Sequence, residues 1–227
     1  MNIVFFHVDH GDHVYYQLAE LAVDAARRLH PEARLVHLTD ASSAALKGVH
    51  GAIRANNAVP REWANVVRIK LMADALTVLD GPTLFIEPDV LLCERWPEME
   101  SACALYVTAR PEPKIMPYNF GVIYARLPQA AGFLHYLSKV AASYPAPCWY
   151  VDQLALAVAL GYPSSIDDSN LHRIQHAPTG TKVGVLSCNK FNYSPEGRDE
   201  ELRPVMHFKG PRKPLMQGYY ERCIALA

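Results

Sequence analysis

The sequence predicts an α/β fold in which a mostly parallel sheet is flanked by helices. Over the first half of the chain, apolar runs typical of strands alternate with segments whose apolar residues recur at helical spacing, and this alternation is characteristic of such folds. Acidic residues follow several of the predicted strands, namely Asp9, Asp40, Glu87 and Asp89. Because ligands bind beyond the carboxyl ends of the strands in these sheets, these residues mark the expected binding edge.

Periodicity and the residues that start or stop helices define each predicted element. Pro60 suits the first turn of a helix, and Gly81-Pro82 breaks the chain before the next strand. Strands are predicted over residues 2–8, 34–38, 51–54, 83–86, 102–108, 121–124, 183–186 and 205–208, and helices over 15–29, 60–79, 130–142, 151–160 and 219–226. No internal repeat or interdomain linker is evident, so residues 1–227 are predicted to form one domain.

The composition argues against several classes of protein. The 22 basic and 23 acidic residues give a formal net charge of −1 without a long basic run, which is not the footprint of a general nucleic-acid binder. No apolar run approaches the roughly 20 residues of a membrane span, and the first residues lack the charged region of a signal peptide. Five widely spaced cysteines predict neither a disulfide framework nor a cysteine zinc site. A cytoplasmic location is therefore expected.

Glu87 and Asp89 stand one residue apart where the apolar run Thr83–Ile86 ends. Two carboxylates at a strand end can point at the same position, and Mg²⁺ or Mn²⁺ is often shared between one or two carboxylates and a phosphate. This stretch therefore indicates a diphosphate bound through a metal ion. The alternative is a strand that ends in a turn with two solvated acids on either side of Pro88.

A second polar stretch follows the short strand predicted over residues 205–208. His207 can complete a metal site that two carboxylates begin. Gly210 would let the backbone approach a ligand closely, and Lys213 can neutralise phosphate charge. The alternative is an ordinary solvated turn rich in glycine, proline and basic residues.

Two further pairs of residues stand at the starts of predicted elements. Asn119 and Gly121 open a strand, and Asp152 and Gln153 open a helix. Each pair also has a structural interpretation, because asparagine is common in turns and aspartate is favoured as a helix cap or first-turn acid.

Together these stretches resemble glycosyltransferase family 8, the glycogenin and bacterial lipopolysaccharide galactosyltransferase group. The family's Asp-x-Asp strand end matches Phe85-Ile-Glu-Pro-Asp-Val-Leu, its Asn-x-Gly strand matches Asn119-Phe-Gly, its Asp-Gln helix start matches Asp152-Gln153, and its closing His-Phe-x-Gly-x-x-Lys-Pro matches His207-Phe-Lys-Gly-Pro-Arg-Lys-Pro. The arginine on the helix before Asp-x-Asp looks like Arg68, and the segment 189–193 resembles the family's Trp-Asn element. The order and approximate spacing agree across most of the chain.

The resemblance implies the GT-A fold, with a Rossmann-like central sheet, and a hexosyl- or pentosyltransferase. Such an enzyme would take a sugar from a nucleoside-diphosphate sugar, with UDP as the expected carrier, and transfer it with retention. Asp89 and His207 would hold Mn²⁺ or Mg²⁺, and Glu87 would ligate the metal or orient the site. The acceptor stays open among a glycan, a lipid-linked sugar, a protein and a modified nucleobase.

The resemblance also assigns the other site residues. The donor-binding set is Asp9, Asp40, Arg68, Asn119, Gly121, Gly210 and Lys213, and the catalytic set is Gln153, Asp152 and Lys213. Asp9 and Asp40 would meet the nucleoside, and Arg68 would lie near the diphosphate. Three departures indicate a divergent member: Glu87 replaces an aspartate, Leu154 replaces a second acid, and Leu215 replaces the final tryptophan.

Two other functions compete with this interpretation. The side chains of His7, Asp9, His10, Asp12 and His13 suit zinc or a dinuclear centre, which would make the protein a metal-dependent hydrolase. Their spacing does not match the pattern His-x-His-x-Asp-His. The third possibility is a protein that keeps the fold and binds a sugar nucleotide without turnover, and the changes at Glu87 and Leu154 leave this possibility open.

Overall fold

The computed structural model describes residues 1–99, 102–111, 116–126, 128–146, 148–161 and 173–226. Its strands are β1 (Asn2–Phe6), β2 (Arg34–Thr39), β3 (Gly51–Arg54), β4 (Thr83–Ile86), β5 (Val90–Leu92), β6 (Leu105–Ala109), β7 (Tyr118–Ala125), β8 (Arg173–His176), β9 (Lys182–Ser187) and β10 (Val205–His207). Its helices are α1 (His13–Leu29), α2 (Ala64–Ala75), α3 (Gln129–Ala142), α4 (Val151–Leu160), α5 (Cys188–Phe191) and α6 (Met216–Leu226), with 3₁₀ turns η1 (Arg61–Trp63) and η2 (Gly210–Leu215).

An eight-stranded sheet in the order β3-β2-β1-β4-β7-β6-β9-β8 forms the centre of the molecule. Strands β3, β2, β1 and β4 are paired in parallel, and β6 is parallel to β9. Strand β7 runs antiparallel to both β4 and β6, and β8 runs antiparallel to β9. The predicted α/β class with a mostly parallel central sheet is therefore confirmed. A separate two-stranded sheet pairs β5 with β10.

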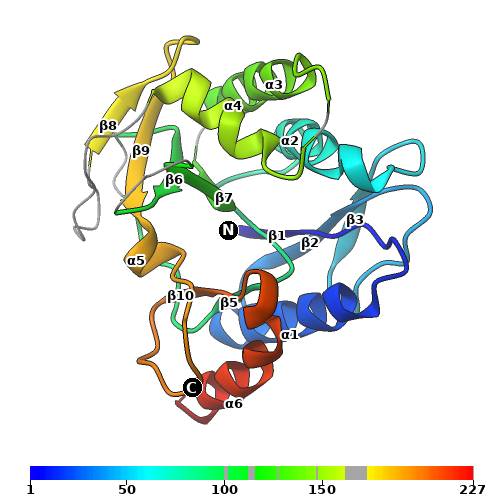
Figure 1. The fold of residues 1–227 in the computed structure, drawn as a ribbon, viewed down its shortest axis with the longest axis vertical. Helices are drawn as coiled ribbons and strands as arrows, with labels where there is room; N and C mark the ends of the chain where they lie inside the picture. The colour runs from blue at the N-terminus through cyan, green and yellow to red at the C-terminus, as the bar shows by residue number, and fades with distance from the viewer. Residues whose placement is uncertain (100–101, 112–115, 127, 147, 162–172, 227) are drawn as a thin grey trace.

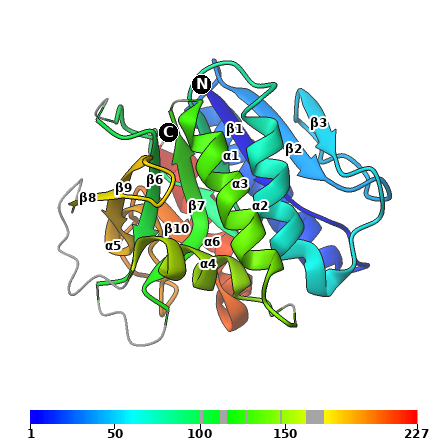
Figure 2. The ribbon, with the colours of Figure 1, turned by 90° about the horizontal axis from the view of Figure 1, so that it is seen from above.

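Helices cover both faces of the large sheet, as Figures 1 and 2 show. Helices α2, α3 and α4 pack against one another on one face, and α1 and α6 lie with β5 on the other. Because both faces are buried, the strands are apolar almost throughout instead of alternating with polar residues. Along β6, for example, Leu105 and Val107 belong to one core and Tyr106 belongs to the other.

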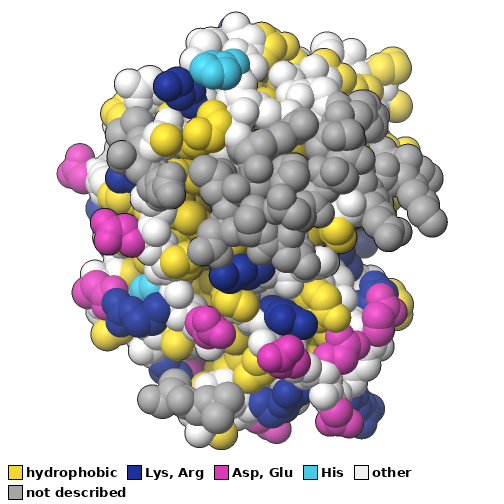
Figure 3. Space-filling view, turned by 90° about the vertical axis from the view of Figure 1, so that its left-hand side faces the viewer, with side chains coloured by type: hydrophobic (Ala, Val, Ile, Leu, Met, Phe, Trp, Pro, Cys, Tyr) yellow, Lys and Arg dark blue, Asp and Glu magenta, His cyan; other side chains and the backbone are white. Residues whose placement is uncertain are grey.

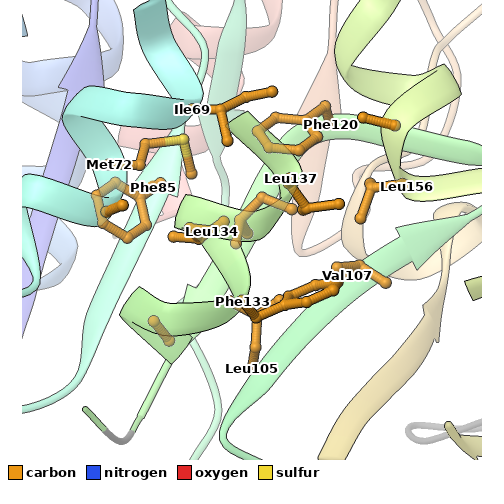
Figure 4. Close-up of a cluster of buried hydrophobic side chains, with 14 of the residues drawn as sticks. Ile69, Met72, Phe85, Leu105, Val107, Phe120, Phe133, Leu134, Leu137 and Leu156 are labelled. Atoms are coloured by element: carbon orange, nitrogen blue, oxygen red, sulfur yellow. The ribbon is translucent and has the colours of Figure 1, made fainter. Parts of the chain in front are cut away.

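Large side chains from three helices fill the core beneath α2, α3 and α4 (Figure 4). Ile69 and Met72 of α2 and Leu137 of α3 point toward Phe120 of β7 and Phe85 of β4. This packing matters for the site because it fixes where α2 and α4 begin relative to the strand ends. On the face in Figure 3, acidic and basic side chains are interspersed, as expected from a formal net charge of −1.

Most predicted elements are confirmed, and three of them, 51–54, 83–86 and 151–160, have the predicted bounds. The helix predicted over 60–79 is shorter, because it begins as the turn η1 and ends at Ala75 before the β-branched Thr77 and Val78. Strand β7 is longer than its prediction of 121–124, and the pattern missed β5, β8, α5 and η2. Strand β8 lies at the sheet edge and lacks an apolar repeat, so it forms through its pairing with β9.

Within the described residues, no helix combines the length and apolar character needed to cross a membrane.

Candidate active site

A cavity of about 470 Å³ opens at the carboxyl ends of β1 and β4. The segment after β1 contributes His7 and Val8, and the segment after β4 contributes Glu87 and Asp89. Helix α2, the start of α4, the segment from β10 into η2, Arg110 after β6 and Asn119 of β7 also line the cavity. The cavity therefore lies at the edge where parallel α/β sheets bind ligands.

Pairing of β5 with β10 brings three of the predicted metal ligands together. The antiparallel register sets His207 opposite Val90, and the amide of Phe208 donates to the carbonyl oxygen of Asp89 at 2.8 Å. The Nε2 atom of His207 consequently lies 3.2 Å from Oδ1 of Asp89 and 3.2 Å from Oε2 of Glu87. These three residues each offer one ligand atom within 4.8 Å of the other two.

Hydrogen bonds hold the His207 ring in the orientation that a metal ligand needs. Nδ1 lies 2.7 Å from Oδ1 of Asn192, whose own amide nitrogen donates to Oγ1 of Thr108 at 2.7 Å. Because the Asn192 amide nitrogen is used by Thr108, its oxygen accepts the proton on Nδ1 of His207. With Nδ1 engaged by Asn192, Nε2 faces the two carboxylates and is the ring nitrogen that a metal ion could use. A hydrogen bond to the ring nitrogen that does not bind the metal fixes the direction of ligating histidines.

Gly121 supplies the space that the cluster occupies. The amide of Glu87 donates to the carbonyl oxygen of Gly121 at 3.0 Å, so β7 runs directly beneath the carboxylates. A Cβ atom added at Gly121 would lie 2.7 Å from Nδ1 of His207 and 2.8 Å from Oε2 of Glu87. A side chain at this position would therefore displace two of the three candidate ligands.

The oxygens of Glu87 have two different partners. Oε1 is paired with Arg68, and Oε2 faces His207. Burial acts to raise the pKa of the Glu87 carboxyl, but Arg68 and His207 outweigh burial and hold that pKa below its ordinary value. Two carboxylate oxygens and one imidazole nitrogen form a set suited to Mn²⁺, and Mg²⁺ favours the two oxygens. The residues present therefore fit a divalent cation.

Arg68 is buried and bridges two carboxylates. One terminal nitrogen pairs with Glu87 and the other with Asp152, while the guanidinium lies 5.1 Å from the centre of the Phe120 ring. Burial raises the pKa of the Asp152 carboxyl to about 6, with Glu87 acting in the same direction and Arg68 opposing it. Arg68 thus ties the start of α4 to the end of β4.

The side-chain amide of Gln153 is oriented by Arg110, which follows β6. Nη2 of Arg110 donates to Oε1 of Gln153 at 2.9 Å, and Nη1 donates to the carbonyl oxygen of Tyr118 at 2.6 Å. Because arginine only donates, the atom facing it must be the amide oxygen. Nearby, Oδ1 of Asn119 accepts from the amide of Gly121, and Nδ2 of Asn119 is buried in the described structure without a hydrogen-bond partner.

Two lysines approach the cavity from the segment after β10. Nζ of Lys213 lies 3.6 Å from Oδ2 of Asp89 and 4.7 Å from the centre of the Tyr15 ring. Lys209 also lines the cavity, and burial lowers the pKa of its ammonium group. Between the two lysines, Gly210 has a φ of 55°, a conformation that favours glycine.

Asp9 and Asp40 are not among the residues that line the cavity. The Asp40 carboxylate is buried and accepts hydrogen bonds from the amides of Ser43 and Val59, both at 2.8 Å. Asp9 is exposed and accepts from the amide of Gly11. The structure therefore gives both carboxylates local structural partners and brings neither of them to the other predicted donor-binding residues.

The histidine-rich segment after β1 does not form a compact metal site. Nε2 of His10 lies 2.8 Å from the carbonyl oxygen of Val59, Asp12 caps α1, and His13 is exposed. Within the described part of the chain, Glu87, Asp89 and His207 are the only such set of three convergent ligand atoms. The geometry thus favours a metal centre at Glu87, Asp89 and His207 over one in the histidine-rich segment.

Sequence reasoning missed several residues of the cavity. Lys209 stands at the first variable position of the His-Phe-x-Gly-x-x-Lys-Pro motif, where the resemblance assigns no role. Trp149, which is 77% exposed, lies three residues before Asp152. Asn192 lies inside the segment matched to the Trp-Asn element. Arg110 carried no signal of its own, because its place beside Gln153 depends on the pairing of β6 with β7 and on the packing of α4 against β7.

Several known structures with a similar fold are glycosyltransferases. A glycosyltransferase involved in the glycosylation of the major capsid of PBCV-1 is 11% identical, with a TM-score of 0.62 over 97% of this chain and 98% of that one. The galactosyltransferase LgtC, solved with donor and acceptor sugar analogs, is 18% identical, with a TM-score of 0.59 over 100% of this chain and 95% of that one. The glycosyltransferase GlyE of Streptococcus pneumoniae TIGR4 is 12% identical, with a TM-score of 0.62 over 99% of this chain and 63% of that one.

No protein-family model and no curated protein sequence matches the chain. Its likeness to known proteins is therefore one of three-dimensional structure, and it extends over nearly the whole of residues 1–227. The chain has the GT-A fold, the fold of these glycosyltransferases.

Proposed function

We propose that the protein is a metal-dependent glycosyltransferase that takes a sugar from a nucleoside-diphosphate sugar, with UDP as the carrier. One observation carries the proposal. Glu87, Asp89 and His207 converge within 4.8 Å at the edge of a cavity, on a fold shared with glycosyltransferases. Lys213 stands 3.6 Å from Asp89 on the same side. This combination suits a diphosphate leaving group.

Asp89, His207 and Oε2 of Glu87 would hold Mn²⁺ or Mg²⁺. A divalent cation bound there supplies Lewis-acid stabilisation of a departing diphosphate. Lys213 adds a positive charge that is already held in place by Asp89 and by the Tyr15 ring. Such a fixed cation stabilises the negative charge that grows on the leaving group without reorganising during the reaction.

Arg68 lines the cavity beside the candidate metal ligands, in keeping with the position near the diphosphate that the resemblance implies. Both of its terminal nitrogens are occupied by carboxylates, one from Glu87 and one from Asp152. We therefore assign Arg68 a positioning role, in which it orients Glu87 toward the metal and fixes the start of α4. Asp152 and Gln153 would then face the transferred sugar together with Asn119, whose buried amide nitrogen offers a donor for a hydroxyl group.

We also propose that the sugar is transferred with retention of configuration at its anomeric carbon, and that the protein is cytoplasmic. Direct inversion requires a free carboxylate base on the acceptor side of the sugar. Asp152, the carboxylate beside Gln153, is instead ion-paired with the buried Arg68. That arrangement supports the retaining outcome that the resemblance implies.

Binding measurements with UDP, with and without Mn²⁺, test the proposal. Mn²⁺ should raise the melting temperature only together with UDP, because a ligand that binds the native state stabilises it. Asp89→Asn should abolish this Mn²⁺-dependent shift, whereas Asp199→Asn, at an exposed position, should leave it unchanged.

Turnover separates the proposal from its two rivals. Slow hydrolysis of UDP-sugars with Mn²⁺ is expected of a transferase that lacks its acceptor. Binding without any turnover would favour the non-catalytic binder. Bound zinc with hydrolysis of substrates that lack a nucleotide would favour the hydrolase.

A further inference from the structure

We infer that the cavity contains an anion-binding subsite formed by Arg110 and Lys209, which takes a carboxylate or phosphate group carried by the transferred sugar or by the acceptor. The inference rests on the proposed function and adds the chemical class of the substrate to it. Arg110 follows β6 and Lys209 follows β10, so the two cations reach the cavity from different segments of the fold.

Among the described residues, the ion pairs of the cavity include neither of these two cations. Arg68 is paired with two carboxylates, and Lys213 stands 3.6 Å from Asp89. Among the described residues, no carboxylate oxygen lies within 4.0 Å of a side-chain nitrogen of Arg110 or Lys209. The hydrogen bonds from Arg110 go to neutral oxygens, those of Gln153, Tyr118 and Met116. Its full positive charge is therefore held in place and is not neutralised.

Arg110 lies on the Gln153 side of the cavity, and Lys209, two residues after His207, lines the same cavity. The guanidinium of Arg110 is 2.9 Å from Oε1 of Gln153, which we place beside the sugar. Burial raises the pKa of the Cys188 thiol, and the charges of Lys209 and Arg110 both oppose that shift, in keeping with their lining of one cavity. A ligand group that met Arg110 beside Gln153 would therefore belong to a sugar or to an acceptor.

Charge balance indicates what that group is. The charged groups described above are three carboxylates (Glu87, Asp89 and Asp152) and four cations (Arg68, Lys213, Arg110 and Lys209). Because a divalent cation and a doubly charged diphosphate ester cancel formally, a donor with an uncharged sugar would leave one positive charge in excess. Partly buried cations without a partner are unfavourable. A cation beside the reacting carbon would also oppose the positive charge that develops there in the transition state. A carboxylate or phosphate on the substrate removes both disadvantages.

Calorimetric titrations of the full chain with Mn²⁺ test the subsite and identify the source of the acidic group. In the donor arm, UDP, UDP-glucose and UDP-glucuronic acid are compared. In the acceptor arm, glucose and glucose 6-phosphate are titrated into protein saturated with UDP and Mn²⁺. We expect the acidic ligand to bind about tenfold more tightly than its neutral counterpart in one of the two arms, as a charge-assisted hydrogen bond provides.

Variants then assign the preference to the subsite. Lys209→Gln should remove most of the preference and change the affinity for UDP itself by less than about twofold. The matched control Lys182→Gln, at an exposed position on β9, should leave every affinity unchanged. Arg110→Lys, which keeps the charge, should retain more of the preference than Arg110→Gln.

Three outcomes would overturn the inference, and they can be told apart. If UDP binds with Mn²⁺ but neither arm prefers the acidic ligand, the subsite is absent and the proposed function stands. If Lys209→Gln weakens UDP as much as it weakens the acidic ligand, Lys209 is a diphosphate anchor. If UDP does not bind with Mn²⁺ at all, the subsite and the proposed function both fail.

Discussion

The Nε2 atom of His207 lies 3.2 Å from Oδ1 of Asp89, although the two residues are far apart in the sequence. They meet because β10 pairs with β5 in the register that sets His207 opposite Val90, the residue after Asp89. A shift of this register by one residue would turn the imidazole to the other face of the strand. The small sheet β5–β10 is thus the element that assembles the candidate metal site.

Gly121→Ala should disrupt the metal cluster while the fold is kept. The added Cβ would lie 2.7 Å from Nδ1 of His207 and 2.8 Å from Oε2 of Glu87, so both side chains must move. We expect the affinity for Mn²⁺ with UDP to fall by about tenfold or more, since even changes to the groups that only orient metal ligands lower metal affinity 10–100-fold. Gly132→Ala in α3 is the matched control, because a Cβ there meets nothing within 4 Å. Normal Mn²⁺ binding by Gly121→Ala would contradict the site.

Asn192→Ala should weaken metal binding without removing a ligand. The side-chain oxygen of Asn192 fixes the tautomer of His207 by accepting from Nδ1 at 2.7 Å. Its loss leaves the ring free to rotate or to place its proton on Nε2, and we expect Mn²⁺ affinity to drop by about 10–100-fold. Melting without metal measures the accompanying loss of stability separately. An unchanged Mn²⁺ affinity would show that His207 is held by its packing alone.

Lys213→Ala should lower turnover more than it lowers donor affinity. The ammonium group lies 3.6 Å from Asp89, where it can meet charge that grows on a leaving diphosphate. Only interactions that strengthen in the transition state raise the rate of the chemical step. Measuring kcat and the UDP dissociation constant in the same variant decides the role. A loss of UDP affinity with unchanged kcat would make Lys213 a simple phosphate anchor.

His37 should make the protein less stable as the pH falls from about 6.5 to about 4. Burial lowers the pKa of the His37 imidazole to about 4, although its hydrogen bond to the carbonyl oxygen of His7 opposes the shift. The unfolded chain therefore binds a proton first, so protonation favours unfolding over this range. The full effect of this 2.5-unit difference is about 3 kcal/mol in the free energy of unfolding.

Comparison of His37→Gln with the wild type isolates this effect. Burial also lowers the pKa values of His7 and His30. Those two residues therefore contribute equally to the pH dependence of the unfolding free energy in both proteins. Urea unfolding at several pH values should give a shallower pH dependence for His37→Gln between pH 4 and pH 6.5. Parallel curves for the two proteins would mean that His37 titrates normally in the folded state.

Local sequence patterns predicted the elements on which the site stands. The apolar run 83–86 is strand β4, and Glu87 and Asp89 follow its end as expected. Helix α4 has the predicted bounds because Gly161, with a φ of 73°, stops it. These features depend on residues a few positions apart, and the preferences of such residues for strand, helix or turn are encoded locally.

Tertiary structure decided which polar residues meet. The register of β5 with β10 placed His207 beside Asp89, and the pairing of β7 with β6 and β4 placed Arg110 beside Gln153 and Gly121 beneath the cluster. Asp40, equally well placed at a strand end, turned inward to the amides of Ser43 and Val59. The sequence by itself determined the strand ends and the chemical types of the side chains there. Their distances and partners depend on strand register and helix packing between distant segments, which no local pattern specifies.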